Sequence, residues 1–136
     1  MRRFTAWLLA ATVLLAGSAA QASLQLRLKT DGLSPAQQQA SQALLDEAMQ
    51  ALPPRFIEQL DRRIDVGWTD EMPANAYGQA SLVSELDLNR KLLASLTDGT
   101  AATQQTQRPH GTVRRELLAT VLHELTHIYD RARLWP

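Results

Sequence analysis

The sequence predicts an α+β fold, in which a small mixed or antiparallel sheet packs on two longer helices. Apolar and polar residues alternate at 23–29 and 63–68, which is the pattern of half-buried strands. Two longer segments, 35–52 and 112–134, are rich in helix-forming residues and contain no glycine, and no proline follows Pro35 in either. The 136 residues amount to a single domain.

The first 22 residues have the layout of a secretory signal peptide. A basic start, Met1-Arg2-Arg3, precedes an uncharged apolar run from Trp7 to Gly17, and Ala20-Gln21-Ala22 supplies the small residues of a cleavage site. The apolar run is well short of the ~20 residues that span a bilayer as a helix. We therefore expect cleavage after Ala22, a periplasmic or secreted protein, and no stable membrane anchor after signal cleavage.

The charge balance argues against nucleic-acid binding. The chain has 14 basic and 14 acidic side chains, so loss of Arg2 and Arg3 with the signal peptide leaves 12 and 14, a net charge of −2. Domains that bind nucleic acid gather Lys and Arg on one face, and the sequence has no such cluster. It also has no cysteine, which excludes disulfides although an exported protein is permitted them.

Turn and cap residues divide the chain between the two longer helices. Thr30-Asp31-Gly32 predicts a turn after the first strand, Ser34 is the expected N-cap of the first helix, and Pro53-Pro54 ends that helix. The segments that follow are predicted to be a helical turn, a strand, a loop, a third strand, a short helix and a polar, mobile linker or flap, at 56–60, 63–68, 69–78, 81–88, 89–96 and 97–111.

The last helix is the clearest element of the sequence. Thr112 is its expected N-cap, and it continues through Leu134 without an interruption. Its apolar residues cover a broad face, which predicts a mostly buried helix. These residues are Val113, Leu117, Leu118, Val121, Leu122, Leu125, Ile128 and Tyr129.

This helix carries the run His123-Glu124-Leu125-Thr126-His127. Residues four apart lie one above the other on a helix, so both imidazoles can bind one zinc ion at ~2.0–2.1 Å. Glu124 is rotated by ~100° from His123, which places its carboxylate beside the ion as a general base for a zinc-activated water. The pattern predicts zinc ligands at His123 and His127 and a catalytic Glu124. The alternative is a pair of core histidines with polar partners.

The run resembles the active-site helix of the zincin metallopeptidases. The resemblance implies that His123 and His127 bind Zn²⁺ and that Glu124 is the base. It also implies an upstream strand that lies along the cleft and pairs with the substrate backbone, and Ser81 to Leu88 is similar in position to that strand. In the metzincin branch a glycine follows the second histidine. The stretch from Ile128 to Leu134 has none, so the run is nearer to the gluzincin type.

A third zinc ligand is not identified by the motif, although catalytic zinc sites use three protein ligands plus water. Asp130 lies on roughly the same face as the histidines, but about 7.5 Å along the axis from their midpoint, beyond the reach of its short side chain. A salt bridge or a contact that supports a ligating histidine is the favoured role of Asp130. The upstream alternatives are His110, Glu85 and Asp87.

The favoured function is an exported zinc-dependent peptidase, or the N-terminal part of one, that cleaves a peptide or a cell-envelope amide. The gluzincin branch takes its third ligand from a later helix, whereas this sequence ends nine residues after His127. We therefore expect residues 23–136 to form a zincin-like domain that is incomplete at its C-terminus. Two alternatives remain: a zinc-binding domain without catalysis, and an exported binding module that holds no metal.

Overall fold

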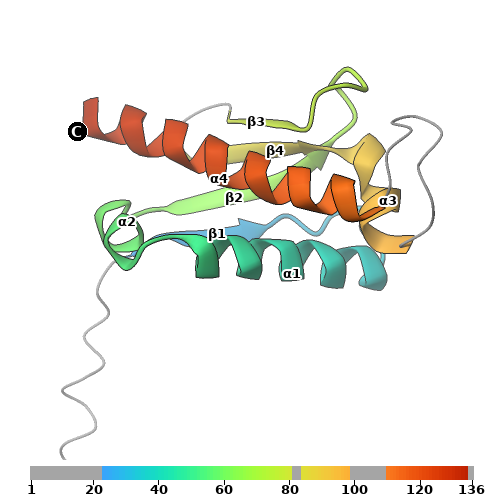
Figure 1. Cartoon of the computed structure of the whole chain (residues 1–136), viewed down its shortest axis with the longest axis horizontal. Coiled ribbons are helices and arrows are strands. Elements are labelled where there is room, and N and C mark those ends of the chain that lie inside the picture. The colour runs from blue at the N-terminus through green and yellow to red at the C-terminus, as the bar shows by residue number, and fades with distance from the viewer. Residues whose placement is uncertain (1–22, 81–83, 99–109, 135–136) are drawn as a thin grey trace, which may run out of the picture.

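A computed structural model describes residues 23–80, 84–98 and 110–134. A mixed sheet packs with helices, which confirms the expected α+β class (Figure 1). The elements in chain order are β1 (Gln25–Leu28), α1 (Pro35–Ala51), α2 (Pro54–Gln59), β2 (Arg63–Thr69), β3 (Gly78–Ala80), β4 (Glu85–Asn89), the 3₁₀ turn η2 (Arg90–Leu92), α3 (Leu93–Asp98) and α4 (His110–Leu134).

The four strands lie in the order β1-β2-β4-β3. β1 runs parallel to β2, and β2 runs parallel to β4, with Leu26 opposite Ile64 and Val66 opposite Leu86. β3 returns antiparallel to β4 at the edge of the sheet, where Ala80 lies opposite Leu86. The one antiparallel strand is therefore the edge strand on the side of α4.

A strand is confirmed at 85–88 of the expected 81–88, and residues 81–83 lie outside the described ranges, but its expected place at the edge of the sheet is wrong. The strand in this region, β4, begins at Glu85 and is paired on both sides, by β2 and β3. The edge strand next to β4 is Gly78–Ala80, a stretch that the sequence pattern places at the end of a predicted loop. Three residues are too few for a period-two pattern to be recognised, so only the pairing with β4 reveals this strand.

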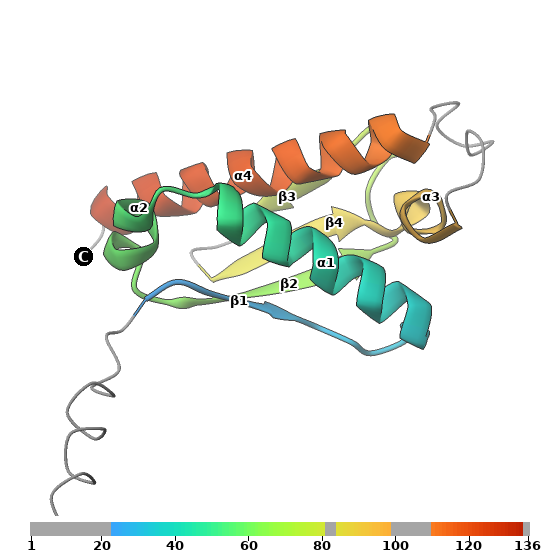
Figure 2. The same ribbon diagram turned by 60° about the horizontal axis from the view of Figure 1, so that its bottom comes forward.

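Alternation along the strands separates an apolar face from a polar one. Helices α1 and α4 lie together on one face of the sheet (Figure 2). The apolar residues that point toward them are Leu26, Leu28, Ile64, Val66, Leu86 and Leu88. Residues of the other parity form the opposite face and include Arg27, Arg63, Asp65, Glu85 and Asp87.

Helix α4 is amphipathic, which corrects the expectation of a mostly buried helix. One stripe is fully buried, with 0% exposure at Val113, Leu117, Val121, Leu125 and Ile128. The opposite side is open to solvent and includes both histidines of the motif. Leu118, Leu122 and Tyr129 widen the apolar face of the helix, but they pack only partly against the core.

The start of α4 also differs from the expectation. The helix begins at His110, so Thr112 lies in its first turn and is not the N-cap. The helix continues through Leu134 as expected, and Leu134 is the last residue that the structure describes.

The beginning of α1 is as predicted. Ser34 lies in extended conformation, and its Oγ accepts the N–H of Gln37 at 3.1 Å. The side chain of Gln37 in turn accepts the N–H of Ser34 at 3.0 Å, which completes a capping box. At the other end, α1 stops at Ala51, and the C-cap Leu52 is extended before the two prolines.

Two expectations fall on residues that the structure does not describe. The predicted signal peptide occupies 1–22, and most of the predicted linker or flap occupies 99–109. The described ends of that linker belong to α3 and α4. Across the described ranges, 23–80, 84–98 and 110–134, no helix combines the length and the apolar character that crossing a bilayer requires.

Candidate metal centre

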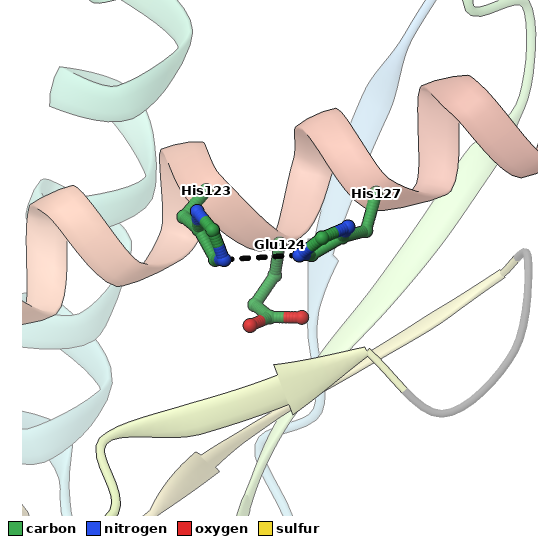
Figure 3. A group of neighbouring side chains, drawn as sticks. All are labelled: His123, Glu124 and His127. Carbon is green, nitrogen blue, oxygen red and sulfur yellow. Dashed lines mark hydrogen bonds between the residues drawn. The ribbon is translucent and has the colours of Figure 1, made fainter.

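The two histidines of the motif converge on one point at the exposed side of α4. The Nε2 atoms of His123 and His127 lie 2.9 Å apart, and the ring planes stand at 89° with their centroids 4.5 Å apart (Figure 3). This arrangement follows from the four-residue spacing, which stacks the side chains on successive turns. The convergence predicted from the sequence is therefore present in the fold.

The spacing of the two nitrogen atoms fits a shared zinc ion. Two nitrogens at ~2.0–2.1 Å from a tetrahedral ion lie roughly 3.3 Å apart, close to the 2.9 Å between the Nε2 atoms of His123 and His127. A small rotation of either ring would reach that value. Both side chains are exposed, so an ion from solution has access to them.

Glu124 completes the cluster. One ligand atom from each of His123, Glu124 and His127 lies within 4.8 Å of the others. The side chain of Glu124 leaves α4 toward β3, where its Oε2 accepts the backbone N–H of Ala80 at 2.8 Å (Figure 3). Across the described part of the chain, the Glu124 side chain makes no other hydrogen bond or ion pair. None of these described residues binds its second oxygen, Oε1.

The buried stripe of α4 fixes the rotation that exposes this cluster. Leu125 lies inside the motif and is fully buried, as predicted, while Val121 and Ile128 anchor the turns on either side. With these side chains in the core, the His123 and His127 positions must face outward, because each lies two residues from Leu125 and therefore about 200° around the helix from it. The same helical spacing therefore buries Leu125 and exposes the two histidines.

A cleft of about 550 Å³ runs beside the cluster. Its lining comes from α4 and from the end of the β3 edge, and consists of Tyr77, Gly78, Glu116, Ala119, Thr120, His123 and Glu124. Gly78 permits the close approach of these two walls. A Cβ at this position would lie 2.8 Å from the backbone oxygen of Asp87 and 3.0 Å from Cγ2 of Thr120.

The candidate third ligands do not join the cluster. Within the described residues, the group that can hold a metal comprises the motif residues alone, without Asp130, Glu85 or Asp87. Asp130 is exposed and lines a separate hollow near the end of α4. His110 begins α4, so its backbone lies roughly 20 Å along the helix axis from that of His123.

Asp87 belongs to a different environment. It lies on the sheet face turned away from α1 and α4, where its Oδ1 approaches Gly67. Burial raises the pKa of Asp87, nearby Lys29 partly offsets that effect, and Glu85 and Glu71 raise the pKa further. The group is therefore part of a polar sheet face and not of the histidine site.

Four residues near the cluster were not identified from the sequence. Tyr77 and Gly78 line the cleft, Ala80 binds Glu124, and Nη1 of Arg131 donates to the carbonyl oxygen of Ala80 at 3.4 Å. The first three were assigned to a loop or to its boundary. A signal was present in the glycine beside an aromatic residue and the polar Gln79 between two small residues, but it is too short to be specific.

Comparison with known proteins identifies a family but no activity. No curated protein and no solved structure matches the chain. Residues 25–136 match a family described as a domain of unknown function, DUF7844. This match covers every described element, from β1 to α4. The protein therefore belongs to the DUF7844 family.

Proposed function

We propose that this protein is a zinc-dependent hydrolase that cleaves an amide bond in a peptide or a cell-envelope component. One observation carries the proposal: His123, Glu124 and His127 bring their ligand atoms within 4.8 Å of one another on the exposed side of α4. A pair of histidines that merely packed in the core would be buried, and both of these are exposed.

The three residues have distinct proposed roles. His123 and His127 would hold Zn²⁺ through their Nε2 atoms, which are the atoms that converge. Zinc in such a site supplies Lewis acidity and lowers the pKa of a coordinated water towards ~7. Glu124 accepts the proton from the attacking water and passes it to the leaving amine, which is general acid–base work for a carboxylate beside the ligands. Its Oε1, to which no described residue is hydrogen-bonded, is suited to this role.

The cleft supports an extended substrate. It lies between α4 and the edge of the sheet, has a volume of about 550 Å³, and is lined in part by His123 and Glu124 of the cluster. A cleft of this size accommodates a short segment of an extended chain beside the two motif residues. Peptides and peptide-like envelope polymers are therefore the substrates that we propose.

The proposed location of this activity is outside the cytoplasm, in the periplasm or the medium. The support is the order of basic start, short apolar run and small-residue cleavage site within residues 1–22. Mass spectrometry of the exported protein should give Ser23 as its first residue. Recovery of a membrane-bound product that retains Met1 would contradict this part of the proposal.

A second candidate function is zinc binding without hydrolysis. It is favoured by the composition of the cluster, since the described residues bring only two histidines and one carboxylate together. In that case Glu124 would itself contact the ion, and no carboxylate would remain to act as a base. The two candidates differ in what the substitution Glu124→Gln does to metal affinity.

The test is a zinc titration of the full chain from Ser23, followed by an assay with casein and a mixed peptide library. His123→Ala and His127→Ala should each remove most of the bound zinc, whereas His110→Ala is a matched control that should bind like the wild type. Glu124→Gln should keep zinc and lower hydrolysis by ~10²–10⁴-fold. Absence of zinc binding at pH 8, where imidazoles are neutral, would refute both candidates, and loss of zinc in Glu124→Gln would favour the second.

A further inference from the structure

The pairing of β3 with β4 determines where the backbone groups of Ala80 point. The N–H of Asn89 donates to the carbonyl oxygen of Tyr77 at 2.9 Å, so these two residues form a hydrogen-bonded pair. In an antiparallel ladder such pairs alternate with pairs whose groups point outward. Gly78 and Ala80 are of the second kind, and their N–H and C=O groups face away from β4.

Helix α4 meets both outward groups of Ala80. Glu124 Oε2 accepts the N–H at 2.8 Å, and Arg131 Nη1 donates to the C=O at 3.4 Å. Glu124 and Arg131 are seven residues apart, about two helical turns, so their side chains leave α4 on the same side. Ala80 is thereby held between two side chains of the helix that carries the proposed metal site.

We propose that the backbone N–H of Ala80 is a positioning group that orients the Glu124 carboxylate for catalysis. By holding Oε2, it leaves Oε1 as the oxygen that takes the proton, and Arg131 keeps Ala80 in place. This inference rests on the proposed hydrolase function for its catalytic consequence, while the hydrogen bond itself can be tested without any activity.

Two features make the contact suited to orientation. A backbone amide at a strand edge is rigid, because the ladder on the other side of β3 and the packing of Gly78 fix its position. Glu124 is only half-buried, and this bond is its one hydrogen bond to a described residue, so without it the side chain would sample several rotamers. A donor fixed in advance removes that freedom before the reaction begins.

The first experiment measures amide hydrogen exchange in the metal-free full chain. Because Ala80 N–H points away from β4, its protection should depend on Glu124, and Glu124→Ala should accelerate its exchange by at least ~10-fold. The matched control is the amide of Asn89, which is bonded to Tyr77 in the same pair of strands and should keep its protection. Unchanged exchange of Ala80 in Glu124→Ala would overturn the proposal.

The second experiment removes the donor itself. Ala80→Pro lacks the N–H and loses no bond to β4, since proline is tolerated where an edge-strand N–H faces outward. Relative to the matched Ala80→Ser, which keeps the N–H, kcat should fall by roughly 10–100-fold while KM and zinc affinity stay within about 2-fold. In a Glu124→Gln background the same change should have no further effect, because the carboxylate that it orients is gone.

These measurements separate the inference from the proposed function. An equal loss of kcat in the Glu124→Gln background would assign Ala80 a purely structural role and overturn the inference. Loss of Ala80 amide protection in Glu124→Ala supports the hydrogen bond even in a chain that hydrolyses nothing, and in that case the hydrolase proposal fails and the orienting contact stands. If Ala80→Pro does not fold, the exchange experiment decides alone.

Discussion

Asn89 and Tyr77 are joined across the end of the sheet by a backbone hydrogen bond of 2.9 Å. The side chain of Asn89 is fully buried, and its Nδ2 donates to the carbonyl oxygens of Pro73 at 2.9 Å and Ala76 at 2.7 Å. Its Oδ1 accepts the N–H of Lys91 at 3.1 Å. The side-chain amide of Asn89 thus links the loop before β3 to the end of β4, and so holds the edge strand β3 beside the proposed site.

Asn89→Asp should lower the free energy of unfolding by roughly 3 kcal/mol or more. The substitution keeps the shape of the side chain but turns two donated hydrogen bonds into contacts between a buried carboxylate and two carbonyl oxygens. Urea unfolding at pH 7 measures the effect. Asn75→Asp is the control, because Asn75 is exposed in the same loop and its replacement should change stability by no more than ~0.5 kcal/mol. Similar values for both variants would refute the role of Asn89.

Gly78→Ala should destabilise the protein by about 1–3 kcal/mol. The added Cβ would lie 2.8 Å from a backbone oxygen of Asp87, which cannot move without separating β3 from β4. Gly67→Ala is a matched control in another strand, since its Cβ would meet the flexible Cδ of Lys29 at 3.3 Å. We expect a change of no more than ~0.5 kcal/mol there. A cost at Gly67 as large as that at Gly78 would contradict this account of the edge.

Asp87→Asn should stabilise the protein at neutral pH. The pKa of Asp87 is raised above its ordinary value of 3.8, chiefly by burial, so the ionised form is less favourable in the folded state than in the unfolded state. That penalty is complete above the folded-state pKa, shrinks as the pH falls through it, and vanishes below 3.8, where both states are protonated. Urea midpoints at pH 7 and pH 3 should differ from the wild type at pH 7 only.

A loss of stability in Asp87→Asn at pH 7 would contradict this expectation. Lys29 lowers the pKa of Asp87 and so favours its ionised form. If the attraction between Asp87 and Lys29 outweighed burial, the variant would be less stable than the wild type at pH 7, and the direction given for this pKa would be wrong.

Asp130→Asn should leave zinc affinity within about 10-fold of the wild type, whereas His127→Ala should remove most of the bound metal. Asp130 is exposed and does not join the atoms that converge at the histidines. Isothermal titration with Zn²⁺ at pH 8 compares the two. A single Asp130→Asn change that abolished binding would make Asp130 a ligand and would require α4 to bend there.

Local pattern predicted the helices well. The capping box at Ser34 and Gln37 satisfies backbone groups within a few residues, so it forms wherever the sequence is helical. The convergence of His123 and His127 is equally local, because it needs only a helix. The burial of α4 was overestimated, since Leu118 and Leu122 extend its apolar face beyond what the sheet and α1 can cover.

The edge strand and its contacts could not be predicted in the same way. Gly78–Ala80 is a strand because β4 pairs with it, and the position of β4 depends in turn on its parallel pairing with β2. The bond from Ala80 to Glu124 joins residues 44 positions apart. No pattern within a short window encodes such a contact, and the third ligand is undefined by the sequence for the same reason.

The other edge of the sheet bears on how the protein behaves at high concentration. β1 is only four residues long. The N–H of Gln25 donates to the carbonyl oxygen of Arg62, and the N–H of Lys29, directly after the strand, donates to that of Val66 in β2. Leu26 and Leu28 therefore direct their N–H groups away from β2. Such an open edge is a template for edge-to-edge association between copies. The exposed cations are Arg27, inside β1, and Lys29, directly after it, and antiparallel pairing of two β1 strands would bring like charges together. This short, positively charged margin disfavours aggregation without covering the edge.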